Sequence, residues 1–188
     1  MGALTLHLRR YGFLWLLLIV YLGYMEWPRW AMALGLLPGA GRPAPQFQVT
    51  DLTGRAIDSR DLSGKVVLVN FWATWCPPCR VEMPGFEKVY RSHRDAGFAV
   101  VAVALDGENR QAVAQVVEEL GLSFAVIPSA GRLPREFGAG PVVPTSFLID
   151  RQGRIRTEVT GIFRETVLRS RVEQLLREPL PAAAAADP

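Results

Sequence analysis

An apolar segment that runs directly into a pair of cysteines most constrains how this chain folds. Residues 66–72 (VVLVNFW) are apolar but for one asparagine and are rich in β-branched side chains, as expected of a strand buried on both faces. The segment Trp75–Cys79 (WCPPC) follows, and residues 76–94 have a helical composition, although Pro84 should kink or restart that helix. The order of strand, cysteine pair and helix therefore predicts an α/β fold with both cysteines at the start of a helix.

Further strands and helices alternate along the rest of the chain. Apolar or alternating runs predict a hairpin at 47–52 and 55–57 and strands at 98–105, 124–127, 145–150 and 155–160. Helical spacing of apolar residues predicts helices at 109–120, 132–137 and 164–177. We therefore expect a central mixed β-sheet with helices on both faces.

Residues 1–36 are predicted to direct the chain to a membrane. Residues 11–25 are uncharged and strongly apolar, but a helix of that length measures about 22 Å at about 1.5 Å per residue, against a hydrocarbon core of roughly 30 Å. Two interpretations remain open: a transmembrane anchor, or a signal peptide cleaved near residues 31–33 (AMA). We favour the anchor, because arginines precede the apolar run and bulky aromatic residues crowd its outer end.

The remaining chain is expected outside the cytoplasm. The short amino-terminal tail is most easily left in the cytoplasm, which predicts a single-pass protein of the bacterial inner membrane with a periplasmic catalytic domain. Residues 37–45 form a Pro/Gly linker, residues 46–178 the folded domain, and residues 179–188 a low-complexity, disordered tail.

Charge and cysteine content exclude several classes of function. The net charge of +3 comes without any run of lysine or arginine, so nothing predicts nucleic-acid binding. Cys76 and Cys79 are the only cysteines, which excludes a disulfide-dense scaffold and any metal site built from three or four thiolates. The two cysteines are therefore expected to act as a pair.

Several kinds of site use a C-x-x-C pair, and most fit this chain poorly. A zinc site needs further ligands, and the only histidines are His7, in the leader, and His93. Haem attachment needs a histidine where Arg80 stands. A purely structural disulfide closing so short a loop gains only about 2 kcal/mol. A reversible dithiol is the interpretation that remains.

The predicted position of the pair supports this interpretation. Free amide N–H groups and the positive end of the helix dipole favour the thiolate of Cys76 and lower its pKa, which makes Cys76 the nucleophile. Cys79 lies one turn into the helix, is expected to be less exposed, and can attack the mixed disulfide that Cys76 forms. Pro77 and Pro78 are tolerated in a first helical turn, where their missing N–H groups would have no helical partner.

Two motifs together resemble a known family. Residues 68–80 (LVNFWATWCPPCR), followed by Glu82 and Pro84, resemble the membrane-anchored TlpA/ResA/CcmG thioredoxin-like proteins. Residues 143–150 (VPTSFLID) are similar to the proline loop and following strand of that group. The resemblance covers about residues 43–177.

The resemblance implies a thioredoxin-like fold with an N-terminal β-hairpin and a central insert around residues 124–137. It also implies an extracytoplasmic thiol-disulfide oxidoreductase whose redox-active disulfide joins Cys76 and Cys79, without a cofactor or a bound metal. A cis peptide bond is expected before Pro144, which packs against the dithiol, and the backbone of Val143 is expected to pair with a substrate peptide as an added strand.

The same resemblance suggests partners for the dithiol. Dithiol-reducing members act on disulfides in apocytochrome c, as in cytochrome c biogenesis, or in copper-site proteins. They receive electrons from a membrane thiol carrier. Nothing in residues 124–137, where the group builds partner specificity, indicates which partner this chain uses.

Glu82 is the candidate for moving a proton to or from Cys79. Cytoplasmic thioredoxins have an acidic residue at the place of Asn70, so that role must lie elsewhere in this chain. Glu82 is three residues after Cys79 on the same helix face, although a solvated surface charge is the alternative. If it is buried, its carboxyl pKa should rise.

The other marked residues have simpler expectations. Trp72 is expected in the core. Trp75, directly before the nucleophile, is expected to be exposed and to contact substrate, with a packing role as the alternative, while Pro77 and Pro78 complete the substrate-binding loop. His93 and Asp106 are expected at the surface or in loops and are assigned no role.

Two other functions are weighed against the reductase. A peroxiredoxin-type peroxidase shares the fold, but the proline and threonine it needs upstream of the nucleophile are replaced by Val69 and Ala73. A non-enzymatic copper carrier could use two thiols as soft ligands, but Sco-type carriers space their cysteines more widely and add a histidine. Peroxide consumption and Cu(I) titration would separate these possibilities.

Overall fold

The computed structural model describes residues 21, 41–128 and 131–180 of the chain. Apart from Tyr21, these residues belong to a unit that spans Gly39–Pro188. Apart from Tyr21, the predicted membrane segment lies outside the described residues, as do residues 181–188. Among the described residues, no helix has both the length and the apolar character needed to cross a membrane.

A six-stranded mixed sheet forms the centre of the unit, with the order β1-β8-β7-β4-β5-β6. Its strands are β1 (Arg42–Pro43), β4 (Val66–Trp72), β5 (Phe98–Ala104), β6 (Ala125–Ile127), β7 (Thr145–Ile149) and β8 (Arg154–Thr160). β4, β5 and β6 are parallel, whereas β7 is antiparallel to both β4 and β8. A separate antiparallel hairpin joins β2 (Gln48–Thr50) to β3 (Ala56–Asp58).

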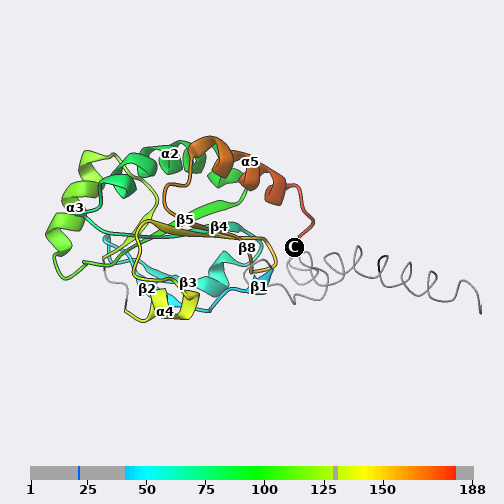
Figure 1. Cartoon of the computed structure of the whole chain (residues 1–188), viewed down its shortest axis with the longest axis horizontal. Helices are drawn as coiled ribbons and strands as arrows, with labels where there is room; N and C mark the ends of the chain where they lie inside the picture. Colours follow the sequence, from blue (N-terminus) through cyan, green and yellow to red (C-terminus); the bar gives the residue numbers. More distant parts are fainter. Residues whose placement is uncertain (1–20, 22–40, 129–130, 181–188) are drawn as a thin grey trace, which may run out of the picture. The chain divides into compact units, whose positions relative to one another are not determined.

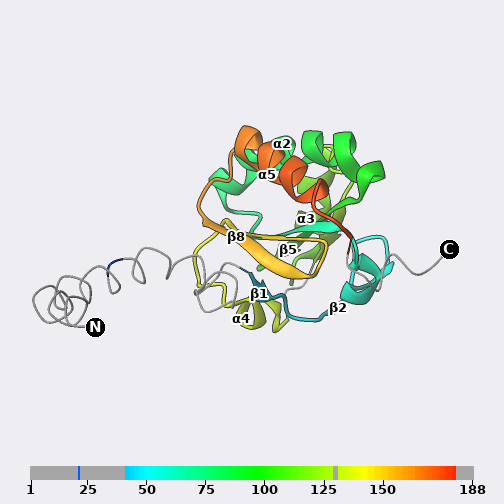
Figure 2. The ribbon, with the colours of Figure 1, turned by 90° about the vertical axis from the view of Figure 1, so that its right-hand side faces the viewer.

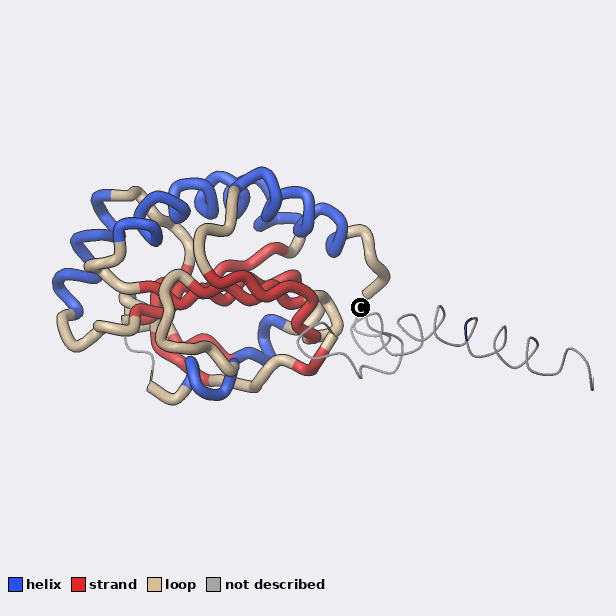
Figure 3. The backbone as a smooth tube through the Cα atoms, in the orientation of Figure 1, coloured by secondary structure: helices blue, strands red, loops and turns tan. Residues whose placement is uncertain are grey.

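Helices cover both faces of this sheet. They are α2 (Pro77–His93), α3 (Arg110–Glu119), α4 (Leu133–Phe137) and α5 (Glu165–Leu176), with 3-10 turns η1 (Ser59–Leu62) and η2 (Arg94–Ala96). α2, α3 and α5 lie on one face, and α4 lies on the other together with the β2–β3 hairpin (Figure 1). A view from the side and a backbone tube show the same three layers (Figures 2 and 3). The fold is thioredoxin-like, as the sequence predicts.

The central strand β4 is buried along its whole length. Leu68 and Trp72 pack into the cluster beneath α2 and α5, while Val69 and Phe71 pack into the cluster beneath α4. A strand with apolar partners on both sides has no solvent face, which is why its sequence is a continuous apolar run. The prediction of a doubly buried strand at 66–72 is confirmed.

Most predicted elements match the observed ones to within a few residues, and Pro84 is the instructive difference. α2 continues through Pro84 as a single helix rather than restarting there. Phe86 and Val89, beyond the proline, are fully buried in the same cluster as Met83 before it. Tertiary packing on both sides of Pro84 therefore outweighs the missing backbone hydrogen bond.

Candidate active site

Cys76 and Cys79 lie where β4 leads into α2, and they form a disulfide with a Cα–Cα distance of 5.4 Å. Cys76 is the N-cap of α2, and its Sγ accepts a hydrogen bond from the backbone N–H of Cys79 at 3.2 Å. Pro77 and Pro78 occupy the first turn, where a missing N–H leaves no helical bond unmade. The sulfur of Cys76 thus takes the place that an oxygen takes in an ordinary N-cap.

Both cysteines are nearly covered in this oxidised state. Cys76 is 2% exposed and Cys79 is 0% exposed, so the expected difference in exposure is present but small. Trp75 is 68% exposed beside them, and Pro77 and Pro78 are also exposed. Trp75 is therefore available for contact with another molecule, whereas Trp72 is a core residue, as predicted.

The proline loop contains the predicted cis peptide bond. The Val143–Pro144 peptide bond is cis, and Val143 packs against the hydrophobic cluster that contains both cysteines. The carbonyl oxygen of Pro144 accepts a hydrogen bond from Gly161 N–H at 2.8 Å. This bond joins the proline loop to the loop after β8, and Phe163 of the second loop belongs to the same hydrophobic cluster as the two cysteines.

Glu82 is buried in the first half of α2, with 4% of its surface exposed. Its Oε1 accepts a hydrogen bond from Asn70 Nδ2 at 3.0 Å, and its Oε2 accepts one from the backbone N–H of Phe163 at 2.8 Å. Burial raises the pKa of Glu82 to about 7, and the two hydrogen bonds oppose that rise only in part. The carboxyl group can therefore gain or lose a proton near neutral pH.

Ser146 is a member of this network that the sequence reasoning missed. Asn70 Nδ2 also donates to Ser146 Oγ at 3.0 Å, and the two residues face each other in the antiparallel register of β4 and β7. Asn70 and Ser146 are both fully buried. The amide of Asn70 thus lies between Glu82 and the strand that follows the proline loop, where it fixes the position of the acid.

The cysteine turn, the proline loop and the loop after β8 are largely apolar and contain no charged residue. Besides Trp75, the exposed apolar residues of the described chain include Val142, next to the proline loop, and Ile162, next to the loop after β8. Residues 73–79, 139–149 and 159–163, which supply the three bordering loops, contain no lysine, arginine, aspartate or glutamate. Val142 and Ile162 were not predicted as site residues, because the resemblance marks only Val143 and Pro144 in the proline loop and no motif marks the loop after β8.

Asp106 was expected at the surface or in a loop and was assigned no role, and the structure places it in a loop where it contacts the cysteine turn. It is half-buried in the turn after β5, and its carboxylate accepts hydrogen bonds from both the backbone N–H and the hydroxyl of Thr74. Thr74 lies two residues before Cys76. His93, in contrast, only contacts Val89 O and Glu173, far along the helices from the disulfide.

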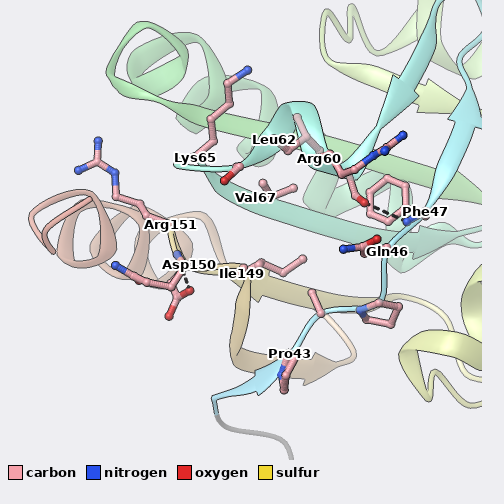
Figure 4. A pocket seen from close by; sticks show the side chains of 16 residues that line it. Pro43, Gln46, Phe47, Arg60, Leu62, Lys65, Val67, Ile149, Asp150 and Arg151 are labelled. Atoms are coloured by element: carbon pink, nitrogen blue, oxygen red, sulfur yellow. Dashed lines mark hydrogen bonds between the residues drawn. The ribbon is translucent and has the colours of Figure 1, made fainter. Parts of the chain in front are cut away.

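A cavity of about 520 Å³ lies elsewhere in the fold and contains neither cysteine. It is lined by residues 43–47, 59–60, 62–63, 65, 67 and 149–153, and Figure 4 shows Leu62, Val67 and others around it. Val67 and Ile149 pair across β4 and β7 at the opposite end of these strands from the cysteine turn. Within the described residues, no cluster of three or more histidine, cysteine, aspartate or glutamate side chains is arranged to hold a metal.

The model of the AhpC/TSA family matches residues 40–158 of this chain. That range covers well over half of the sequence, including the cysteine pair, Glu82 and Pro144. The chain belongs to this thioredoxin-like family. The same range includes every strand of the described sheet except the last two residues of β8.

Curated relatives and a solved structure narrow the class of chemistry. The chain is 42% identical over 122 residues to the thiol-disulfide oxidoreductase ResA of Bacillus thuringiensis strain Al Hakam, covering 64% of this chain and 69% of that protein. It is 34% identical over 161 residues to ResA of Geobacillus thermodenitrificans, covering 85% and 91% respectively. A thiol:disulfide interchange protein from Chlorobium tepidum superposes with a TM-score of 0.68 at 31% identity, covering 74% and 99%. The chain is therefore a thiol-disulfide oxidoreductase.

Proposed function

We propose that this enzyme reduces disulfides in protein substrates, with Cys76 as the nucleophile and Cys79 as the resolving thiol. The observation that carries the proposal is the position of the disulfide at the N-terminus of α2, with the backbone N–H of Cys79 directed at the sulfur of Cys76. Once the pair is reduced, the same N–H and the positive end of the helix stabilise a thiolate on Cys76. Among the described residues, none donates a comparable hydrogen bond to the sulfur of Cys79, so Cys79 is expected to react second.

The reaction transfers two electrons to the substrate. The Cys76 thiolate attacks one sulfur of the substrate disulfide, and the other substrate sulfur leaves as a thiolate that takes up a proton. Deprotonated Cys79 then attacks the sulfur of Cys76 in the mixed disulfide, and the second substrate thiol is released. The product is the Cys76–Cys79 disulfide, which is the state of this structure.

Glu82 is assigned the proton transfer at Cys79. It lies three residues further along α2, and side chains at that spacing are neighbours on one helix face. A carboxyl group with a pKa of about 7 is matched to general acid–base work at neutral pH. Ionised Glu82 accepts the proton of Cys79 before the second attack. Protonated Glu82 returns that proton to Cys79 when the electron donor reduces the Cys76–Cys79 disulfide again.

Substrate docking is assigned to the uncharged region around the disulfide. Trp75, Val142 and Ile162 supply exposed apolar surface, and Val143 offers main-chain groups with which an extended peptide can pair. Pro77 and Pro78 are exposed between the two cysteines and complete the proposed docking surface. This arrangement suits an unfolded or extended segment whose cysteine is flanked by uncharged residues.

The cellular setting is also part of the proposal. The apolar run at residues 11–25 supports a single membrane anchor with the catalytic domain in the periplasm. Apocytochrome c, or a copper-site protein, is the proposed substrate, and a membrane thiol carrier is the proposed electron donor. The named relatives are disulfide oxidoreductases, which supports this function over peroxide reduction or copper delivery.

Replacing Cys79 by Ser tests the mechanism. The reduced variant should attack a disulfide-containing apocytochrome peptide and accumulate as a stable mixed disulfide through Cys76, which mass spectrometry identifies. The matched variant, Cys76→Ser, should trap far less of the peptide. Equal trapping by both variants would contradict the assigned order, and rapid peroxide consumption or tight Cu(I) binding by the reduced wild type would favour the alternatives.

A further inference from the structure

The turn that carries Cys76 is held against the end of the neighbouring strand. The backbone N–H of Cys76 donates to Ala73 O at 3.2 Å, which closes a turn over residues 73–76. The backbone N–H of Leu105, just after β5, donates to Trp72 O at 2.8 Å. Because β4 and β5 are parallel, the residues that follow the two strands meet at the same edge of the sheet.

Asp106 lies at this edge of the sheet and binds the turn over residues 73–76 directly. Its two carboxylate oxygens lie 3.2 and 3.1 Å from the backbone nitrogen of Thr74, and one of them also accepts the Thr74 hydroxyl. Both polar hydrogens of Thr74 are therefore bound to one carboxylate. The contact spans 32 positions in sequence, and it fixes the backbone two residues before the nucleophile.

Asp106 also brings a negative charge to a region with few charges. The loops that border the disulfide contain no ionisable residue other than the cysteines. Among neighbouring charges on α2, Arg80 forms an ion pair with Glu119 at 2.6 Å, and Glu82 is buried and bound to Asn70 and Phe163. Asp106 binds only uncharged groups in the described part of the chain, so its charge is not neutralised by an ion pair.

We propose that Asp106 is a positioning residue for Cys76, which fixes the turn through Thr74 and limits how strongly the Cys76 thiolate is stabilised. This inference rests on the proposed role of Cys76 as nucleophile. A nearby carboxylate opposes the helix dipole, and a less stabilised thiolate is intrinsically the better nucleophile. The nearby carboxylate also disfavours the reduced state of the cysteine pair, and this keeps the dithiol a reductant rather than an oxidant.

Alkylation of the single thiol in full-length Cys79→Ser protein tests whether the charge of Asp106 affects the Cys76 thiolate. The rate with iodoacetamide, followed across pH, gives the fraction of Cys76 present as thiolate. Asp106→Asn keeps one oxygen acceptor and removes the charge. Its rate at pH values below the Cys76 pKa, divided by its own plateau rate at high pH, should therefore rise about threefold, the change in thiolate fraction expected from about half a pKa unit. Asp106→Glu, which restores the charge, and Asp95→Asn, an exposed control, should both titrate like the parent.

The thiol-disulfide exchange equilibrium with glutathione, measured on the protein that keeps both cysteines, tests whether Asp106 disfavours the reduced dithiol. Asp106→Asn should shift the exchange constant about threefold towards the reduced dithiol, whereas Thr74→Val, which loses a hydrogen bond but no charge, should shift it less. If Asp106→Asn does not fold, Asp106→Ser supplies a second uncharged variant. Loss of stability without any shift in alkylation or exchange would overturn the inference. A parent Cys76 that titrates like ordinary cysteine, near pH 8.5, would instead overturn the proposed function.

Discussion

The two halves of α2 each bury a glutamate, Glu82 near the disulfide and Glu87 farther along. Glu82 accepts hydrogen bonds from an amide side chain and a backbone N–H, and it forms no ion pair within the described residues. Glu87 accepts the backbone N–H of Ser123 at 2.8 Å as well as its hydroxyl, and it pairs with Arg91. The two carboxylates are similarly covered but have different partners.

The pKa values of Glu82 and Glu87 are shifted in opposite directions from the ordinary value of a glutamate. Burial raises the pKa of Glu82 to about 7 because its hydrogen bonds recover only part of the lost hydration. Burial also acts to raise the pKa of Glu87, but hydrogen bonds from Ser123 and Arg91 outweigh it, and the pKa is lowered. Burial alone therefore does not make a proton-transfer group. The depth of burial and the set of donors together decide whether the pKa of a buried acid is raised or lowered.

The largest expected effect is on the pH dependence of stability. The folded-state pKa of Glu82 lies above its ordinary value of 4.5, so its contribution to stability is full below pH 4.5 and is lost as pH rises to about 7. The loss amounts to about 3 kcal/mol, at about 1.4 kcal/mol per unit. Urea unfolding of the oxidised protein between pH 4 and pH 8 should show this slope, and Glu82→Gln should remove it.

Glu87→Gln is the matched control for that measurement. Because the pKa of Glu87 is lowered on folding, its contribution is present above pH 4.5 and is lost as pH falls below that value. The control should therefore keep the slope between pH 4.5 and pH 7 and reduce the loss of stability in acid. If the free energy of unfolding of the Glu82→Gln protein falls with pH as steeply as that of the wild type, the proposed difference between the pKa values of Glu82 and Glu87 is refuted.

The next effect is on the rate of disulfide exchange. Glu82→Gln keeps the shape of the side chain but cannot carry the Cys79 proton, so single-turnover oxidation of the reduced protein by a peptide disulfide should slow about a hundredfold at pH 7. Stopped-flow tryptophan fluorescence measures this rate. Glu87→Gln should react within about twofold of wild type, because Glu87 is bonded to the loop before β6 and not to the site. Equal rates for both variants would remove Glu82 from the mechanism.

A smaller effect is expected on stability when the structural carboxylate is removed. Glu87→Ala should lower the free energy of unfolding at pH 7 by about 2 kcal/mol, since the backbone N–H of Ser123 loses its acceptor and Arg91 loses its partner. Glu118→Ala, at an exposed position of α3, should change it by less than about 0.5 kcal/mol. Similar losses in the two variants, measured by urea titration, would contradict the assigned role of Glu87.

The smallest expected effect concerns Ser146. Ser146→Ala removes one acceptor from Asn70 Nδ2 but leaves the bond to Glu82, so stability should fall by about 1 kcal/mol. The stability slope between pH 4.5 and pH 7 should remain, because both donors to Glu82 are retained. A slope that vanishes in Ser146→Ala would show that Ser146, rather than burial, sets the acidity of Glu82.

Much of the fold could be predicted because local signals agree with tertiary packing. The strand at 66–72 is a continuous apolar run buried on both faces, and the helix from Asn109 to Leu120 begins at an asparagine cap and ends before a glycine with positive φ. The cysteine pair and the cis bond before Pro144 were accessible from motifs. Pro84 was predicted to kink or restart the helix, and α2 does not restart there, because its continuation depends on packing that only the assembled core provides.

The supporting contacts of the site could not be predicted from the sequence. Ser146 meets Asn70 across 76 positions, and this pairing depends on the register between β4 and β7. Asp106 meets Thr74 only because two parallel strands end side by side. The raised pKa of Glu82 arises from burial beneath elements distant in sequence, and the lowered pKa of Glu87 arises largely from hydrogen bonds with Ser123. No local sequence pattern indicates either environment.

The acidity of Glu82 itself is the most direct test of the account. Carboxyl ¹³C resonances of labelled glutamates in the oxidised protein, assigned through Glu82→Gln and Glu87→Gln, report both titrations in one experiment. The account predicts a midpoint near pH 7 for Glu82 and one below the ordinary value of 4.5 for Glu87. A Glu82 resonance that titrates with its midpoint at pH 4.5 or below would contradict the account.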